Sequence, residues 1–269
     1  MSSAMLIDIT RCIGCNACAE ACKETNKLGG EIEDQLSART WTRVREVKGS
    51  YVRQMCMHCR KPSCASVCPV GALHATPEGP VAYDEKKCIG CRYCMVACPF
   101  GIPKYEWEKA LPRVQKCIGC ISRIQKGEIP ACAAACPAES TVAGTRDSLL
   151  AEAHRRIDAN PGQYVDHVYG ETEVGGTNVM FLSALPFEQL GFPMTLPNAP
   201  MPDLTWQALS KIPTVVSVGG LSLLGIWWII ERRMRIERIG EEAAAGAHGA
   251  VLKFQSPAPD ASQSKRGVS

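Results

Sequence analysis

The strongest hydrophobic pattern in this chain is one long apolar run near its C-terminal end. Residues 212–230 hold nineteen consecutive uncharged positions, with Trp206 before them and Trp227 and Trp228 at their far end. A helix of this length, rising about 1.5 Å per residue, spans about 28 Å, which is close to the hydrocarbon thickness of a bilayer. Tryptophans at both ends match the aromatic belts of membrane proteins. The run therefore predicts a single transmembrane helix, and a buried core helix is the less favoured interpretation.

The rest of the chain alternates short hydrophobic pieces with polar and glycine-rich ones. Residues 41–47 and 81–83 have the composition of strands, and residues 174–182 indicate a turn that enters a strand. Residues 19–26 and 148–157 have apolar positions at helical spacing. Such short elements predict an α+β fold with little regular structure.

Sixteen cysteines interrupt this pattern in four groups of four, and none is left over. The groups are Cys12, Cys15, Cys18 and Cys22; Cys56, Cys59, Cys64 and Cys68; Cys88, Cys91, Cys94 and Cys98; and Cys117, Cys120, Cys132 and Cys136. The first and third groups follow the spacing C-x2-C-x2-C-x3-C, which holds [4Fe–4S] clusters in bacterial ferredoxins. Proline follows the last cysteine of the other groups, whereas Lys23 follows Cys22. The pattern predicts four [4Fe–4S] clusters in a chain that conducts electrons.

The spacing suits the chemistry of a cubane cluster. A [4Fe–4S] cluster needs four thiolates, and three cysteines two residues apart can wrap one side of it. The fourth cysteine of such a run ligates the other cluster in ferredoxins that hold two. Small residues such as Gly14, Ala17, Gly90 and Gly119 lie between the ligands, and they let backbone N–H groups approach the sulfurs. Cys-Ile-Gly-Cys recurs in the first, third and fourth groups, so each group is expected to be half of a ferredoxin-like module.

Two other uses of these cysteines are less favoured. Disulfides rarely follow such regular two-residue spacings, and disulfide scaffolds are usually shorter chains. Zinc sites use separated C-x2-C pairs. Zinc fits best at the fourth group, where residues 121–131 separate Cys120 from Cys132. A membrane-tethered zinc-binding scaffold therefore stays an alternative to an electron carrier, and it would contain no iron.

Composition and charge narrow the function further. The chain of 269 residues has a net charge of +3 and lacks a basic run with interleaved aromatics, which argues against nucleic-acid binding. It contains no Ser–His–Asp arrangement, P-loop or dinucleotide motif, so no catalytic residue is expected. His58 lies between Cys56 and Cys59. It is expected to neighbour the cluster or lie on the surface, because four cysteines already complete that site.

The charges around the apolar run predict its orientation. Four arginines follow the run within eight residues, whereas one lysine, Lys211, directly precedes it; the arginines are Arg232, Arg233, Arg235 and Arg238. The positive-inside rule then puts the C-terminus in the cytoplasm and the cysteine-rich region in the periplasm of a bacterium. The N-terminal residues carry no signal-peptide pattern, so export is expected to depend on a partner's signal. A cytoplasm-facing subunit is the alternative.

These features divide the chain into parts. Residues 1–140 are expected to form a double ferredoxin-like domain, and residues 141–205 an extension that packs on it. Residues 206–238 form the predicted anchor, with its span at 212–230. Residues 239–269 are rich in Ala, Gly, Ser and Pro and are expected to be disordered. The predicted fold class is thus α+β, with tandem bacterial-ferredoxin-like modules and a C-terminal single transmembrane helix.

Several stretches of the sequence resemble a known family. They are CIGCNACAEAC from residue 12, CMHCRKPSCASVCPVGAL from residue 56, CIGCRYCMVACPFGIPKY from residue 88 and VGGTNVMFL from residue 174. With the apolar span they cover about residues 6–238 and resemble the four-cluster iron–sulfur subunits of respiratory oxidoreductases. Within that family the chain is similar to the membrane-anchored beta subunit of formate dehydrogenase and to the iron–sulfur subunit of hydrogenase-2. The resemblance implies an electron-transfer subunit without a catalytic centre of its own.

The resemblance also implies how the clusters share ligands and what the partners are. The implied ligand sets are Cys12, Cys15, Cys18 and Cys136; Cys117, Cys120, Cys132 and Cys22; Cys56, Cys59, Cys64 and Cys98; and Cys88, Cys91, Cys94 and Cys68. The first two clusters would lie nearer a catalytic subunit, either a molybdopterin formate dehydrogenase or a [NiFe] hydrogenase. The other two would lie nearer the lipid bilayer, where a cytochrome b or another quinone-reactive subunit takes the electrons. This arrangement implies a single-pass protein of the bacterial inner membrane.

Overall fold

Three strands that are far apart in the sequence form the central sheet. In the computed structural model, which describes residues 3–254, β1 (Ser3–Asp8) lies between β8 (Thr141–Thr145) and β9 (Val179–Leu182). β1 pairs antiparallel with β8 and parallel with β9. Because β1 precedes the first cysteine group and β8 follows the fourth, the sheet brings these two groups together.

The two faces of this sheet belong to different cores. Leu6 packs with Leu149 of α6 (Arg146–Ala159), which covers one face. Ile7 and Phe181 point to the opposite face, where they join a core that includes several cysteines. Successive strand residues alternate between the faces of a sheet. The sheet therefore separates an ordinary apolar core from the region that holds the thiols.

Three antiparallel hairpins surround the cysteine groups. They are β2 (Arg43–Val47) with β3 (Ser50–Gln54), β4 (Leu73–Ala75) with β5 (Val81–Tyr83), and β6 (Lys104–Tyr105) with β7 (Val114–Gln115). At the tip of the first hairpin, Lys48 and Gly49 have φ values of +51° and +74°. Two successive left-handed residues match the twist of paired strands, so this turn closes the hairpin tightly.

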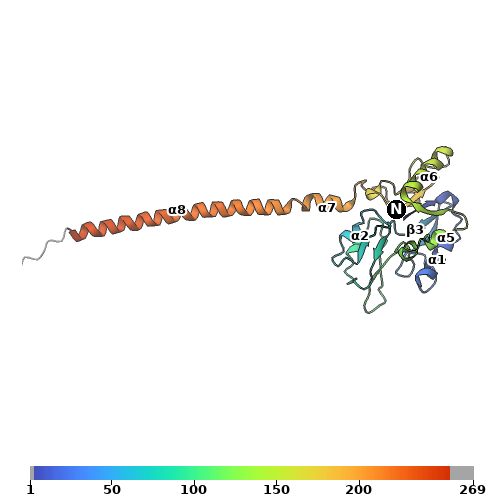
Figure 1. Ribbon diagram of the computed structural model, residues 1–269, viewed down its shortest axis with the longest axis horizontal. Helices are drawn as coiled ribbons and strands as arrows, with labels where there is room; N and C mark the ends of the chain where they lie inside the picture. The colour runs from blue at the N-terminus through green and yellow to red at the C-terminus, as the bar shows by residue number, and fades with distance from the viewer. Residues whose placement is uncertain (1–2, 255–269) are drawn as a thin grey trace, which may run out of the picture. The chain divides into compact units, whose positions relative to one another are not determined.

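Short helices follow the cysteine loops and pack in pairs. α1 lies against α5, as Figure 1 shows, and α2 lies against α3. The five short helices are α1 (Ala17–Asn26), α2 (Ser63–Ser66), α3 (Tyr93–Ala97), α4 (Ile121–Ile124) and α5 (Ala131–Ala134). The other short elements are 3₁₀ turns at Ile9–Arg11, Glu173–Gly175 and Phe187–Leu190 and the helix α7 at Met201–Leu209. Each helix pair joins two cysteine groups.

The chain divides into two units, Met1–Gln207 and Ala208–Ser269. The second unit is dominated by α8 (Ile212–Phe254), drawn as one continuous coil in orange and red in Figure 1. Among residues 3–254, the stretch Met201–Ala244 is the one helical region long and apolar enough to cross a membrane. Its apolar window has a mean hydropathy of 1.7, and none of that window is buried. A core helix would be mostly buried, so the finding favours the predicted anchor.

Most predicted elements are confirmed. α1 contains residues 19–26, α6 contains residues 148–157, β5 occupies residues 81–83, and β9 follows the turn predicted within 174–182. The strand expected at 41–47 begins instead at Arg43. The elements were predictable because each carries its own local pattern of apolar residues.

The helix α8 extends into the predicted C-terminal tail. It continues through Phe254, so the structure describes residues 239–254 as helical, and the expected disorder of residues 239–269 stays a prediction. Their sequence is rich in Ala and also contains Glu241 and Glu242. Ala and Glu are strong helix formers, so the helix continues beyond the apolar run. The remainder of the predicted tail, residues 255–269, lies outside the described residues.

Candidate iron–sulfur cluster sites

The structure gathers the sixteen cysteines into four sets of four thiols. Three sets line small cavities of their own. In the remaining set, Cys59 lies close enough to three other thiols for their charges to act on it. We name the sets site A (Cys12, Cys15, Cys18, Cys136), site B (Cys22, Cys117, Cys120, Cys132), site C (Cys56, Cys59, Cys64, Cys98) and site D (Cys68, Cys88, Cys91, Cys94). These sets are the ones that the family resemblance implies.

Each site takes three thiols from one cysteine group and one from another. The pairing of β1 with β8 and the packing of α1 on α5 join the first and fourth groups, so Cys22 and Cys136 cross over between sites A and B. The β4–β5 hairpin and the packing of α2 on α3 join the second and third groups in the same way. Cys68 and Cys98 cross over between sites C and D. The fold thus contains two modules, one nested in the sequence of the other.

Tight backbone turns bring the loops close to the cavities. Gly119 has a φ of +68°, and a Cβ at this position would lie 2.6 Å from Pro80. Its backbone N–H lies 3.4 Å from the Cys117 sulfur, to which it donates. Only glycine combines a left-handed backbone with so close an approach. The small residues between the cysteines therefore serve the geometry of the loop and supply N–H donors to sulfur.

The thiols are not paired with one another in disulfides. All sixteen cysteines are free. Within residues 3–254, no group of three or more Cys, His, Asp and Glu side chains is arranged to hold a metal ion. Structural zinc requires four ligands at tetrahedral distances from one ion.

Burial and crowding make these thiols poor acids on their own. Burial, followed by the charge of neighbouring Cys132, raises the pKa of Cys22 to about 12. Burial and nearby thiols also raise the pKa of Cys64 to about 12 and that of Cys94 to about 11. Four thiolates can share such a site only when cations compensate their charge, and metal binding releases the thiol protons. The donor set fits an iron–sulfur cluster.

Arg53 is a functional residue that the sequence did not reveal. This side chain of β3 is 3% exposed and lines the cavities of both site A and site B. Its Nε donates to Thr42 Oγ1 at 3.0 Å and its Nη1 donates to Thr141 Oγ1 at 3.1 Å. Burial alone would lower the pKa of Arg53, but the thiolates of Cys132 and Cys18 raise it. A permanent positive charge therefore lies between the two sites.

His58 is buried beside a cysteine of another group. Its Nε2 lies 3.5 Å from the Cys117 sulfur of site B, although its own loop belongs to site C. Burial, followed by the charge of Lys116, lowers the pKa of His58 well below its usual value, so the ring is neutral. Of the two expectations for His58, the structure supports the neighbour of a cluster and not the surface residue.

Site D has a different environment. Although burial opposes it, the hydroxyl of Tyr83 and the backbone N–H groups of Val114 and Gly90 together lower the pKa of Cys88. Cys88 is only partly buried. Hydrogen-bond donors, together with the charge of the partly exposed Arg113, thus stabilise the thiolate of site D.

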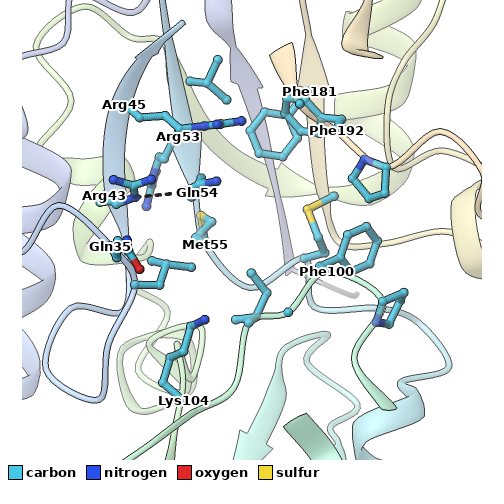
Figure 2. Close-up of a pocket in the computed structure, with 18 of the residues that line it drawn as sticks. Gln35, Arg43, Arg45, Arg53, Gln54, Met55, Phe100, Lys104, Phe181 and Phe192 are labelled. Carbon is cyan, nitrogen blue, oxygen red and sulfur yellow. Dashed lines mark hydrogen bonds between the residues drawn. The ribbon is translucent and has the colours of Figure 1, made fainter. Parts of the chain in front are cut away.

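A further cavity lies outside the four thiol sets. It has a volume of about 690 Å³. Figure 2 shows Arg43, Arg45 and Arg53 on one side of it, facing aromatic rings that include Phe100 and Phe181. Arg43 Nε donates to Gln54 Oε1 at 2.7 Å, while burial, followed by the neighbouring Arg45, lowers the pKa of Arg43. Arg53 lines this cavity and also the cavities of sites A and B. Its positive charge is therefore shared between this cavity and those two sites.

Comparisons with known proteins agree with this site chemistry. Two models of 4Fe-4S dicluster domains match residues 47–146 and 11–72. A protein of Nitratidesulfovibrio vulgaris is 40% identical over 96% of this chain and 74% of its own. The hydrogenase-2 operon protein HybA of Escherichia coli O157:H7 is 38% identical over 71% of this chain and 73% of its own. The iron–sulfur subunit of nitrate-inducible formate dehydrogenase from Escherichia coli K12 is 37% identical over 66% and 67%.

These matches cover most of each relative. The resemblance seen in the cysteine motifs is therefore confirmed, as is the α+β fold with ferredoxin-like modules and one apolar C-terminal helix. The chain belongs to the [4Fe–4S] iron–sulfur subunits of respiratory oxidoreductases, the electron-transfer subunits of the formate dehydrogenase and hydrogenase type.

Proposed function

We propose that sites A, B, C and D each hold one [4Fe–4S] cluster and that electrons pass along them in this order or its reverse. The order rests on the electrostatic effect that a thiol of one site has on a thiol of the next. Burial is the main cause of the raised pKa of three thiols, and a thiol of the adjacent site adds to each. Cys132 of site B raises the pKa of Cys18 of site A, Cys56 of site C raises that of Cys117 of site B, and Cys94 of site D raises that of Cys64 of site C. This single row of neighbours is the observation that carries the proposal.

Each bound cluster supplies one-electron redox chemistry. The chain's own residues provide the rest of the function. Thiolates hold the iron, backbone N–H groups such as that of Gly119 donate to sulfur, and Arg53 compensates negative charge. All four cysteines of site B are buried, so water is kept from the inner part of the row. The chain conducts electrons and carries no catalytic centre.

The ends of the row are the places for exchange with partners. Cys15 of site A is exposed, and the adjacent Ile13 is 60% exposed. At site D the corresponding Ile89 is 65% exposed, and Val96 is 89% exposed. Exposed apolar side chains beside a redox centre favour a docked protein. The names of the relatives support a formate dehydrogenase or hydrogenase as the complex to which the chain belongs. We propose that a molybdopterin formate dehydrogenase or [NiFe] hydrogenase catalytic subunit docks at site A and that a cytochrome b or other quinone-reactive subunit docks at site D.

We place the protein in the bacterial inner membrane, anchored by α8, with the sites in the periplasm and the C-terminus in the cytoplasm. The arginines after the apolar run support this orientation through the positive-inside rule. The proposal includes export together with a signal-bearing partner.

Metal analysis of the anaerobically purified complex tests the proposal. We expect about sixteen irons and sixteen acid-labile sulfides per chain, because each cluster contains four of each. An iron content near twelve would remove one of the sites, and zinc without iron would support a scaffold. The same preparation identifies the catalytic partner. Either formate or hydrogen, supplied to the intact complex, should reduce the clusters, and the substrate that does so names the type of partner.

A further inference from the structure

His58 stands where the other cysteine groups have a glycine. In each C-x2-C turn that opens a group, the third residue has a left-handed backbone. The φ values are +72° for Gly14, +47° for His58, +70° for Gly90 and +68° for Gly119. A residue with a side chain is disfavoured in this region, and such strain persists where the surrounding structure enforces it. His58 therefore occupies a position at which glycine would be easier to accommodate.

The ring of His58 is held in one orientation and one tautomer. The backbone N–H of Val81 donates to Nδ1 at 3.0 Å, so Nδ1 must be the acceptor. The ring proton then lies on Nε2, which faces the Cys117 sulfur at 3.5 Å. The side chain is 2% exposed, so water does not compete for this contact. The loop of site C thus donates an N–H···S hydrogen bond to a thiolate of site B.

A buried ammonium group lies beside this contact. Lys116 precedes Cys117 in the sequence and is 2% exposed. Its Nζ donates to the carbonyl oxygens of Val81 at 2.7 Å and Cys117 at 2.9 Å. No Asp or Glu among residues 3–254 forms an ion pair with it. Its positive charge acts on Cys64 of site C as well as on His58.

We propose that His58 and Lys116 form an electrostatic bridge at the junction between the two modules, which raises the reduction potentials of the clusters in sites B and C. Reduction adds one negative charge to a cluster. Hydrogen bonds to sulfur and nearby positive charges stabilise the reduced form, and they are main determinants of cluster potential. His58 acts on site B through Cys117, whereas Lys116 acts on both sites. The inference rests on the proposed function, because it requires clusters at these sites.

Two substitutions in the full-length complex test this role. His58→Gly restores the residue found in the other turns, so the backbone is satisfied while the N–H···S bond is lost. Lys116→Met keeps the length of the side chain and removes its charge. We expect His58→Gly to lower the midpoint potential of the site B cluster alone. Lys116→Met should lower the midpoint potentials of the clusters in sites B and C. The potentials of the other clusters should stay unchanged in both variants. EPR-monitored redox titration measures each potential separately.

Matched controls are available on the surface. His74 and Lys126 are exposed, so His74→Ala and Lys126→Met should leave all potentials unchanged. His58→Gln keeps an N–H donor and should recover part of the shift. Unchanged potentials in both His58→Gly and Lys116→Met, with full iron content, would overturn the bridge. If only one of these two variants loses iron, the midpoint potentials of the other variant test the proposal. If both lose iron, His58→Gln and Lys116→Arg are measured as conservative replacements. Failure of both replacements to restore the iron content would show that the residues serve cluster assembly and that the proposal is wrong. Fewer than four clusters in the unmodified protein would instead contradict the proposed function.

Discussion

At the scale of single residues, the last cysteine of each group has a separate role from the three before it. Cys22 lies with the fourth group and Cys136 with the first. These crossings mean that the position of a cysteine in the sequence does not identify the site to which it belongs. A substitution should therefore damage a cluster whose other ligands are distant in the chain.

We expect Cys136→Ser to damage the cluster of site A and to spare that of site B. The reason is that Cys136 lines the cavity of Cys12, Cys15 and Cys18, although Cys132 is its sequence neighbour. EPR spectra and iron content of the purified variant measure the loss. Cys132→Ser is the matched control and should damage site B. Loss of only the site B signal in Cys136→Ser would refute the crossed arrangement.

A second residue-level prediction compares two glycines with similar backbones. Gly119 and Gly127 have φ values of +68° and +80°, but a Cβ added at Gly127 would meet nothing within 4 Å, whereas one added at Gly119 would meet Pro80. Gly127→Ala should cost about 1–2 kcal/mol from the left-handed backbone alone. Gly119→Ala should cost about 1–3 kcal/mol more, because the added methyl overlaps Pro80. Thermal unfolding of both variants measures the difference, and equal transition temperatures would show that crowding at Pro80 is unimportant.

At the scale of elements, the sequence was informative wherever one segment determines its own structure. The helix at 148–157 and the strand at 81–83 carry local apolar patterns, and both are present. The grouping of the cysteines was also readable, because three ligands of one cluster lie on one loop. The crossed sets came only from the family resemblance, because they depend on pairing between β1 and β8, which are far apart in the sequence.

Buried charges escaped the sequence analysis for a physical reason. Arg53 and Lys116 look like ordinary surface residues in the sequence, since such side chains are rarely buried without a partner. Their partners are hydroxyl and carbonyl groups brought in by tertiary packing, together with the thiols. One retrospective signal was available for His58: it replaces the glycine of a repeated Cys-Ile-Gly-Cys turn.

The long helix α8 leads to a prediction about attachment. Removing residues 212–269 should release the assembled complex from the membrane without loss of iron, because the thiol sets lie entirely in the unit Met1–Gln207. Fractionation of cells and iron analysis of the soluble fraction measure this result. Removing residues 255–269 alone is the control and should leave the complex in the membrane. A truncated protein that stays in the membrane would show that its partners suffice as the anchor.

At the scale of the whole molecule, the proposed row of sites has exposed apolar residues at both ends, and site B in its interior is buried. Ile13 and Ile89 mark the two ends, and the cysteines of site B are all buried. Such a distribution suits a subunit that accepts electrons at one surface and delivers them at another. The orientation of this row across the cell envelope is a separate question, which the arginine bias addresses.

Protease treatment of spheroplasts tests the orientation. We expect the unit with the cysteines to be digested from outside and a C-terminal epitope tag to be protected, because the arginines after the apolar run favour the cytoplasm. Deleting the signal-bearing partner should leave the cysteine-rich unit inside the cell. Digestion of the tag with protection of the cysteine-rich unit would support the cytoplasm-facing alternative.

The nesting of one module inside the other also sets an order for biosynthesis. The thiols of sites C and D all lie at or before Cys98, whereas sites B and A also take Cys132 and Cys136. A nascent chain therefore contains all the ligands of the inner module while the outer one is still open. β8 and β9, which close the sheet around β1, are synthesised later still. In the proposed arrangement, iron delivery to sites A and B waits for Cys132 and Cys136, and a ribosome stalled before residue 132 leaves a chain with the complete thiol sets of sites C and D alone.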